Sequence, residues 1–137
     1  MKPSLQAGAA HVKRLVVDDS RLISFMGEDA RVYSTPSLIR DIEHACRDLI
    51  LQHADAGEDS VGMEIAMKHL APTLPGSNVE ISVRVTAVEG RKVSFEVAAR
   101  DDLEAISSGT HARFVVNVDK TVERLKAKAA KRDALKK

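Results

Sequence analysis

One acidic residue lies where the surrounding pattern favours apolar side chains. Glu43 follows Ile39 by four residues and precedes Ile50 by seven, on the apolar side of a predicted helix. A carboxylate in that place would lose hydration, which makes it a stronger base. The alternative is that Glu43 lies at the edge of the apolar stripe, exposed and paired with Arg40 or Arg47.

A histidine continues the alternation of a predicted strand. Apolar residues recur at every second position from Val61 to Met67, and His69 follows in the same register. The imidazole is therefore expected to face the same way as those side chains. A histidine on an apolar face can be a satisfied core residue. Because Glu43 and His69 fall on consecutive elements of a small domain, they could also form an acid–base pair.

A threonine stands at the predicted start of the helix. In Thr35-Pro36, threonine is an accepted N-cap and proline fits the first helical turn, where no intrahelical N–H is needed. This structural role is sufficient by itself to explain Thr35. Its hydroxyl would nevertheless lie at the positive end of the helix, beside unpaired N–H groups that bind anions and polarise carbonyls.

The elements that position these residues follow from hydrophobic spacing. Helical spacing over residues 36–52 gives way to a period of two after Ser60. The expected order is a strand at 11–18, a loop or short helix at 20–32, one long helix at 36–52, then strands at 61–70, 79–87, 93–99 and 106–118. Glu89-Gly90 predicts a hairpin, and Phe114, Val116 and Val118 are expected to share the apolar face of the last strand.

This order predicts an α+β hotdog fold, with an antiparallel sheet wrapped around one long central helix. A two-layer arrangement with the helix lying on an open sheet is the alternative. The 137 residues fit one domain at 1–118, followed by a basic helix or tail at 119–137. The tail has eight Lys or Arg and three Asp or Glu, a net charge of +5, so the remaining residues sum to −4 in a chain of net charge +1. It is either a solvated helix or a basic element near an anionic ligand.

Composition excludes several classes of function. With one Tyr, three Phe and no Trp, a stacking surface for nucleic acid is not expected. No apolar run reaches the roughly 18–20 residues that cross a bilayer, so no membrane partner is expected. The single cysteine, Cys46, cannot form an internal disulfide, and a cytoplasmic location is expected. The five histidines show no metal-binding spacing, so neither a metal nor a cofactor is predicted.

Four segments, at residues 33–46, 60–76, 88–91 and 108–116, resemble the fluoroacetyl-CoA-thioesterase-like family of hotdog-fold acyl-CoA thioesterases. The resemblance extends from about residue 5 to residue 118. Glu43 comes eight residues after Thr35, and His69 comes twenty-six after Glu43, which matches the family's spacing. A glycine at the position of Gly62 and an arginine at that of Arg113 also recur in the family.

The resemblance implies a homodimeric enzyme that hydrolyses an acyl-CoA thioester, with further stacking of dimers left open. Glu43 would act as general base or nucleophile, His69 would hydrogen-bond to the reacting groups, and Thr35 would position the nucleophile or water. The Gly62 N–H would help to hold the thioester oxygen, and Arg113 would support the site. His111 belongs to the same motif as Arg113 and is expected to be structural, because its strand parity is opposite to that of Phe114.

One departure limits what the resemblance implies. The member specific for fluoroacetyl-CoA has an aromatic-rich lid, whereas residues 25–33 here contain only Phe25 and Tyr33 as aromatics. A different short or medium acyl group is therefore expected. A non-catalytic acyl-CoA-binding hotdog module is the alternative function. The hypothesis of a hotdog hydratase has less support, since Asp41 and His44 do not have the order and position of the helix motif usual in hydratases.

Overall fold

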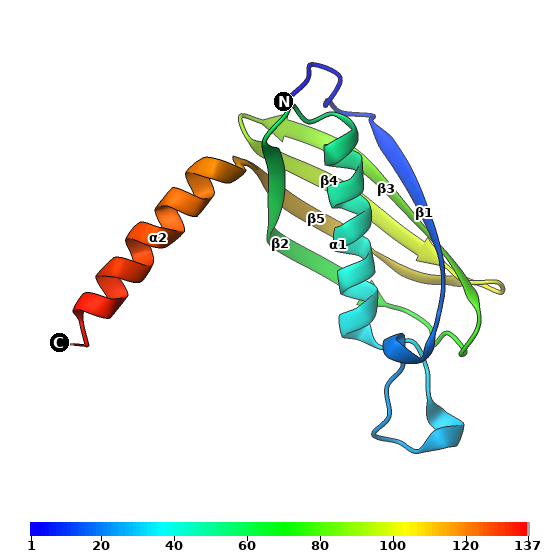
Figure 1. The fold of residues 1–137 in the computed structure, drawn as a ribbon. Coiled ribbons are helices and arrows are strands. Elements are labelled where there is room, and N and C mark those ends of the chain that lie inside the picture. The colour runs from blue at the N-terminus through cyan, green and yellow to red at the C-terminus, as the bar shows by residue number, and fades with distance from the viewer. Residues whose placement is uncertain (137) are drawn as a thin grey trace.

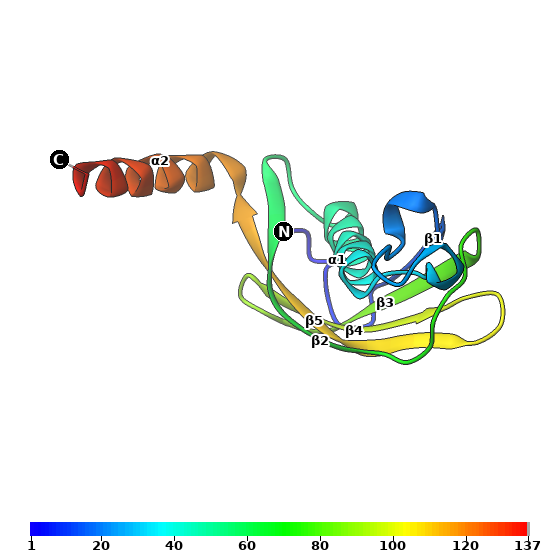
Figure 2. The ribbon, with the colours of Figure 1, turned by 90° about the horizontal axis from the view of Figure 1, so that it is seen from below.

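The computed structural model describes residues 1–136 and has a five-stranded antiparallel sheet that curves around one long helix (Figures 1 and 2). Its elements are β1 (Ala10–Val16), two 3₁₀ turns (Asp19–Arg21 and Glu28–Ala30), α1 (Thr35–Gln52), β2 (Glu58–His69), β3 (Asn78–Glu89), β4 (Lys92–Arg100), β5 (Ala105–Asn117) and α2 (Val118–Ala134). The strand order is β1-β3-β4-β5-β2. The predicted α+β hotdog architecture is confirmed, because the sheet encloses α1 on its concave side.

The helix α1 extends over the predicted range, but its cap differs from the prediction. The Ser34 hydroxyl accepts a hydrogen bond from the Ser37 N–H at 3.1 Å, so Ser34 is the N-cap. The prediction that Thr35 is the cap is therefore wrong, and Thr35 is the first helical residue. The buried face of α1 consists of Leu38, Asp41, Ile42, Ala45, Cys46, Leu49 and Ile50.

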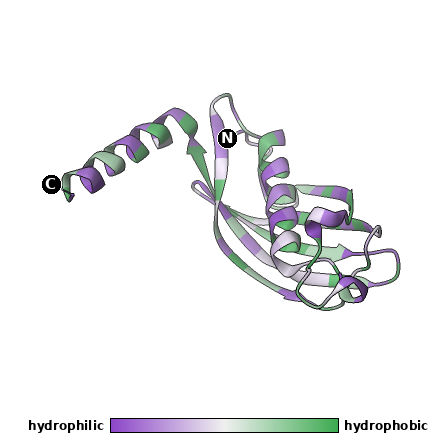
Figure 3. Ribbon diagram, turned by 60° about the horizontal axis from the view of Figure 1, so that its bottom comes forward, coloured by the Kyte–Doolittle hydropathy of each residue, from purple (hydrophilic) through white to green (hydrophobic). Residues whose placement is uncertain are grey.

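The central strands β3 and β4 supply the surface on which α1 packs. The hairpin between them is confirmed, since Glu89 pairs with Lys92 and Gly90 takes a positive φ of 63°. The predicted alternation holds up to Val85, but a register shift follows it, so that Val88 and not Ala87 pairs with the buried Val93. The buried side chains are Val79, Ile81, Val83, Val85, Val93, Phe95, Val97 and Ala99. Figure 3 shows hydrophobic and hydrophilic positions interspersed along these strands, as expected where one face packs on a core.

The strand β2 contains a bulge that the sequence did not predict. Gly62 pairs with Arg113 and Glu64 pairs with Ala112 of β5, so Met63 is an extra residue with no partner of its own. The extra residue reverses the alternation of the side chains that follow it.

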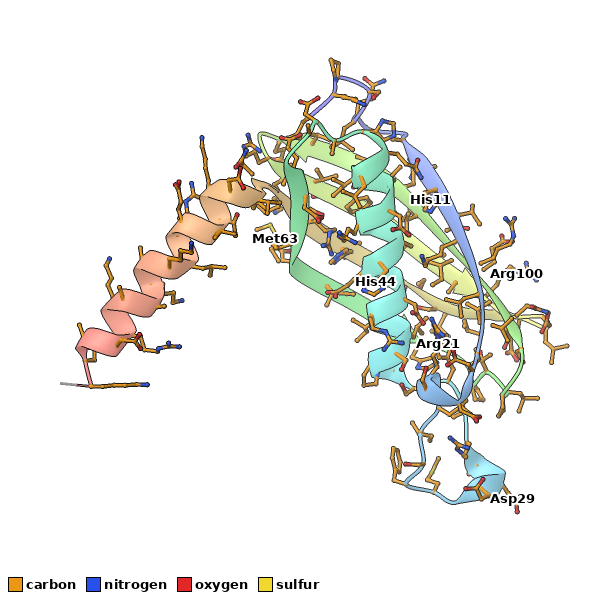
Figure 4. The ribbon with its side chains drawn as sticks, viewed as in Figure 1. His11, Arg21, Asp29, His44, Met63 and Arg100 are labelled. Atoms are coloured by element: carbon orange, nitrogen blue, oxygen red, sulfur yellow. The ribbon has the colours of Figure 1, made fainter. Side chains whose placement is uncertain are left out.

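The bulge decides which residues of β2 face α1. Ile65 and Met67 pack against the core, and His69 shares their face as predicted. The prediction is wrong for Val61 and Met63, which are 50% and 49% exposed on the opposite face. Figure 4 shows Met63 on the side of β2 away from α1.

The last strand also has the opposite parity to the prediction. His111, Arg113 and Val115 are buried, whereas Phe114 is 40% exposed. Apolar residues occupy both faces at this end of β5, so spacing alone did not distinguish the inner face from the outer one. The correction places His111 and Arg113 together beneath α1.

The segment between β1 and α1 is anchored at its base. Arg21 binds the buried Asp41 carboxylate through Nε at 2.9 Å and Nη2 at 3.2 Å, and the Tyr33 hydroxyl donates to the same carboxylate at 2.5 Å. Phe25, near the tip of the segment, is 80% exposed. Figure 4 shows Arg21 beside α1 and Asp29 at the far end of the segment. The loop or short helix predicted here consists of the two 3₁₀ turns.

The C-terminal helix α2 projects away from the sheet (Figures 1 and 2). The predicted helix is therefore present, and none of its residues is buried. The last residue of the predicted basic tail, Lys137, lies outside the described residues. Within residues 1–136, no helix combines the length and apolar character needed to cross a membrane.

Candidate active site

Thr35 and His69 meet where the start of α1 approaches the end of β2. Thr35 Oγ1 lies 2.7 Å from His69 Nδ1, a hydrogen-bonding distance. Because Ser34 caps the helix, the Thr35 hydroxyl is free to make this contact. Burial lowers the pKa of His69, which favours its neutral form. Its Nε2 is buried and has no hydrogen-bond partner among residues 1–136.

A pocket of about 370 Å³ opens beside the Thr35–His69 pair. Its lining residues are Ile23, Phe25, Val32, Tyr33, Ser34, Thr35, His69, Leu70, Ala71 and Pro72. Most of these side chains are apolar, while the polar groups of the pair lie at one wall. Such a pocket suits an apolar group attached to a polar reacting centre.

Glu43 lies above Gly62, the residue just before the bulge of β2. A Cβ placed on Gly62 would be 3.1 Å from Glu43 Oε1, 3.4 Å from His111 Cε1 and 3.6 Å from Arg113 Nη1. Three polar side chains from α1 and β5 therefore converge on a point that the glycine leaves open. A larger residue at position 62 would occupy the space between them.

The cations nearest to Glu43 on its own helix have other partners. Arg47 binds Asp59 through two hydrogen bonds of 2.9 and 2.7 Å, and the carboxylate closest to Arg40 is that of Asp41, at 3.8 Å. Glu43 forms no ion pair or hydrogen bond within the described part of the chain. Its predicted alternative, pairing with Arg40 or Arg47, is therefore not seen.

Arg113 is held beneath Glu43 by buried contacts. Its Nε donates to Ser60 Oγ and its Nη2 to the Ser60 carbonyl, both at 2.8 Å, and its Nη1 lies 3.3 Å from His111 Nε2. Burial lowers the pKa of Arg113, while the nearby Glu43 carboxylate acts in the opposite direction. The guanidinium remains charged because arginine stays protonated in proteins.

Within one chain, the predicted residues form two groups. Thr35 contacts His69, and Glu43 lies over Gly62 and Arg113. Thr35 and Glu43 are eight residues apart on α1, which corresponds to about 12 Å along the helix axis. His69 bonds to Thr35 and makes no hydrogen bond to Glu43. Within residues 1–136, no group of three or more His, Cys, Asp or Glu side chains is arranged to hold a metal ion.

Sequence reasoning expected His111 to be structural and did not place it beside Arg113 beneath α1. Two residues on a strand separated by one position share a face, so His111 and Arg113 had to point the same way. That spacing was a usable signal. The wrong parity assigned to Phe114 concealed it.

Comparison with known proteins places this chain among thioesterases. The model of the fluoroacetyl-CoA-specific thioesterase family matches residues 17–119. The fluoroacetyl-CoA thioesterase of Streptantibioticus cattleyicolor is 30% identical over 127 residues, which cover 88% of this chain and 91% of that protein. The matches favour hydrolysis over the binding-module and hydratase alternatives.

Two solved structures are similar over most of the fold. A thioesterase superfamily member from Thermus thermophilus has a TM-score of 0.87 at 26% identity, covering 98% of this chain and 99% of that one. A mutant of the fluoroacetyl-CoA-specific thioesterase FlK, in complex with fluoroacetate and CoA, has a TM-score of 0.78 at 29% identity, covering 85% and 98%.

The buried histidines predict a pH dependence of stability. Burial lowers the pKa values of His69 and His111 in the folded chain, whereas in the unfolded chain they titrate near the ordinary value of about 6.5. As the pH falls from about 7 to about 5, the unfolded state binds more protons, so the free energy of unfolding should decrease. Urea denaturation at several pH values measures this. His69→Gln should show a shallower decrease, and an equal slope would contradict the assignment.

Proposed function

The chain belongs to the fluoroacetyl-CoA-specific thioesterase family and is an acyl-CoA thioesterase, and we propose that it hydrolyses a short or medium acyl-CoA with Thr35, Glu43 and His69. The observation that carries this proposal is the Glu43 carboxylate, which has no ion pair within the described residues and lies over the open position at Gly62. A partly buried carboxylate with no bound cation keeps its lone pairs available for chemistry.

Hydrolysis adds water across the C–S bond of the thioester. In the proposed reaction, Glu43 takes a proton from water as the water oxygen bonds to the carbonyl carbon. Alternatively, the carboxylate attacks that carbon directly and water then hydrolyses the resulting anhydride. The C–S bond breaks, and the coenzyme A thiolate leaves and is protonated. Charge on the thioester oxygen would be stabilised by the Gly62 N–H and by the positive end of α1.

Arg113 and the Thr35–His69 pair have supporting roles in this proposal. Arg113 lies beside Gly62 on the face toward α1 and would offset negative charge that develops there. The Thr35 hydroxyl and the neutral His69 ring would orient the nucleophile or the thioester carbonyl at the wall of the apolar pocket.

The pocket supports a short or medium acyl group. Its volume of about 370 Å³ lies at the lower end of the usual range for ligand pockets. Tyr33 does not act as a free lid aromatic, since its hydroxyl is bonded to the buried Asp41. The remaining aromatic, Phe25, is largely exposed. We therefore do not extend fluoroacetyl specificity to this chain.

We also propose that the two groups are joined across a homodimer. β2 is an edge strand, and its free side has no partner strand within residues 1–136. Unpaired edges favour association with another strand. If two copies of β2 pair antiparallel about a twofold axis midway between Gly62 and His69, Gly62 of one copy lies beside the partner subunit's His69. Glu43 of one chain would then face the Thr35–His69 pair of the other.

The first functional prediction concerns the base. Glu43→Gln keeps size and shape but removes the charge, so kcat should fall roughly 10²-fold or more while acyl-CoA binding survives. Thiol release over a panel of acyl-CoAs measures turnover, and calorimetry measures binding. His44→Gln, at the adjacent exposed position on α1, is the matched control. Wild-type turnover by the Glu43 variant would show that the assigned base is wrong.

Mixing two inactive variants tests the shared site. If each site uses Glu43 from one chain and His69 from the other, heterodimers of Glu43→Gln with His69→Ala contain one intact site. Co-refolding equal amounts should then recover about a quarter of wild-type activity, since half of the dimers are mixed and each has one intact site of two. No recovery, although light scattering shows a dimer, would place both residues of each site in one chain.

A separate experiment tests whether the basic helix α2 contributes to coenzyme A binding. We propose that α2 lies near the phosphates of coenzyme A at the subunit boundary, because residues 119–137 carry a net charge of +5 whereas the rest of the chain sums to −4. Deleting residues 124–137 should raise KM for acyl-CoA and weaken its dependence on salt, with kcat unchanged. None of the described α2 residues is buried, so the truncated domain should still fold. An unchanged KM and salt dependence would identify α2 as a solvated helix.

A further inference from the structure

His111 is a buried polar residue that the proposed mechanism leaves without a role. Its ring stacks on Phe95 with 6.2 Å between the ring centroids. Its Nδ1 lies 2.7 Å from the Glu64 carbonyl oxygen, and its Nε2 lies 3.3 Å from Arg113 Nη1. The two ring nitrogens thus each have a partner, on opposite sides of the ring.

These partners assign the tautomer. A carbonyl oxygen only accepts hydrogen bonds and a guanidinium only donates them. The proton of the neutral ring must therefore be on Nδ1, which leaves the lone pair of Nε2 facing Arg113. Burial lowers the pKa of His111 and thus favours this neutral form.

The donor side of the ring fixes the bulge in β2. Glu64 directly follows the extra residue Met63, and its carbonyl is the acceptor for His111 Nδ1. The bulge keeps Gly62 facing α1 beneath Glu43, so this bond holds the backbone of the site. Loss of this hydrogen bond is therefore expected to lower the stability of the fold.

The acceptor side of the ring restrains Arg113. Ser60 holds Nε and Nη2, and His111 Nε2 is the described partner of Nη1. Arg113 Nη1 and Glu43 Oε1 both lie close to the open position at Gly62, yet they form no ion pair. If the Nε2 acceptor were lost, only Ser60 would restrain the planar guanidinium. The group could then rotate as a whole and bring Nη1 into a direct ion pair that ties up the Glu43 carboxylate.

We propose that His111 is a positioning residue that holds the Arg113 guanidinium on the Ser60 side and so keeps the Glu43 carboxylate free to react. The proposal rests on the assignment of Glu43 as the reacting carboxylate. It gives the two ring nitrogens separate tasks: Nδ1 stabilises the bulge, and Nε2 acts on turnover through Arg113.

Two amide substitutions separate these tasks. In His111→Asn, the short amide reaches the place of Nδ1 and can still donate to the Glu64 carbonyl, but no acceptor faces Arg113. In His111→Gln, the longer amide places its oxygen where Nε2 was and can accept from Arg113, while the bond to Glu64 is lost. We expect Asn to lower kcat by about tenfold with little change in KM, and Gln to retain most of kcat with a lower melting temperature.

A double-mutant cycle connects the effect to Glu43. If His111 acts through the carboxylate, His111→Asn should change kcat little in a Glu43→Gln background, because there is no longer a charge for Arg113 to bind. Equal loss of kcat in the presence and absence of the Glu43 charge would overturn the proposal. So would equal kcat values for the Asn and Gln variants.

The outcomes also distinguish this inference from the proposed function. If Glu43→Gln alone turns over at the wild-type rate, the assignment of Glu43 fails whatever His111 does. If Glu43→Gln is impaired but the cycle is additive, only the role of His111 fails. If His111→Asn does not fold, the test depends on His111→Gln alone. A kcat of His111→Gln close to that of wild type supports the acceptor role. A loss of kcat as large as that of Glu43→Gln overturns it.

Discussion

A single extra residue in β2 sets the geometry on which the candidate site depends. Gly62 and His69 are seven positions apart, so in a regular strand they would face opposite sides of the sheet. The bulge at Met63 shifts the register by one residue and turns both toward α1. Without it, either the open position beneath Glu43 or the partner of Thr35 would lie on the outer face. The bond from His111 to the Glu64 carbonyl supports the backbone at that point.

The bulge also explains how a charged arginine is accommodated in the sheet. Arg113 pairs with Gly62, where no side chain competes for the space beneath α1. Burying a cation is costly unless its donors have partners. Both oxygens of Ser60 and the lone pair of His111 supply them. With these donors bound, Arg113 exerts its positive field on the space near Glu43 and yet does not neutralise the carboxylate by direct contact.

The elements of this fold were predictable because most of them follow from local periodicity. The spacing of Leu38, Ile42 and Leu49 indicates a helix whatever the tertiary structure, and alternation likewise identifies β3 and β4. The bulge was not predictable. Val61 and Met63 are apolar and continue the alternation of Ile65 without a break, so the pattern assigned them to the inner face, whereas they lie on the outer one. The inner face of β5 was ambiguous for a related reason, since hydrophobic side chains at its end occupy both faces. Type and spacing drew attention to Thr35, Glu43 and His69, and the family resemblance joined them into one candidate group. Their division into two groups required the register.

The division of roles between Ser34 and Thr35 shows how narrowly the site depends on sequence. Both residue types are good N-caps, and either hydroxyl could satisfy a free N–H of the first turn. A threonine that capped the helix would direct its oxygen at the backbone and could not contact the imidazole in the same conformation. Because Ser34 takes the cap, Thr35 lies one position into the helix and its hydroxyl points to His69. The conventional reading of Thr-Pro as a cap therefore concealed the contact between this hydroxyl and the imidazole.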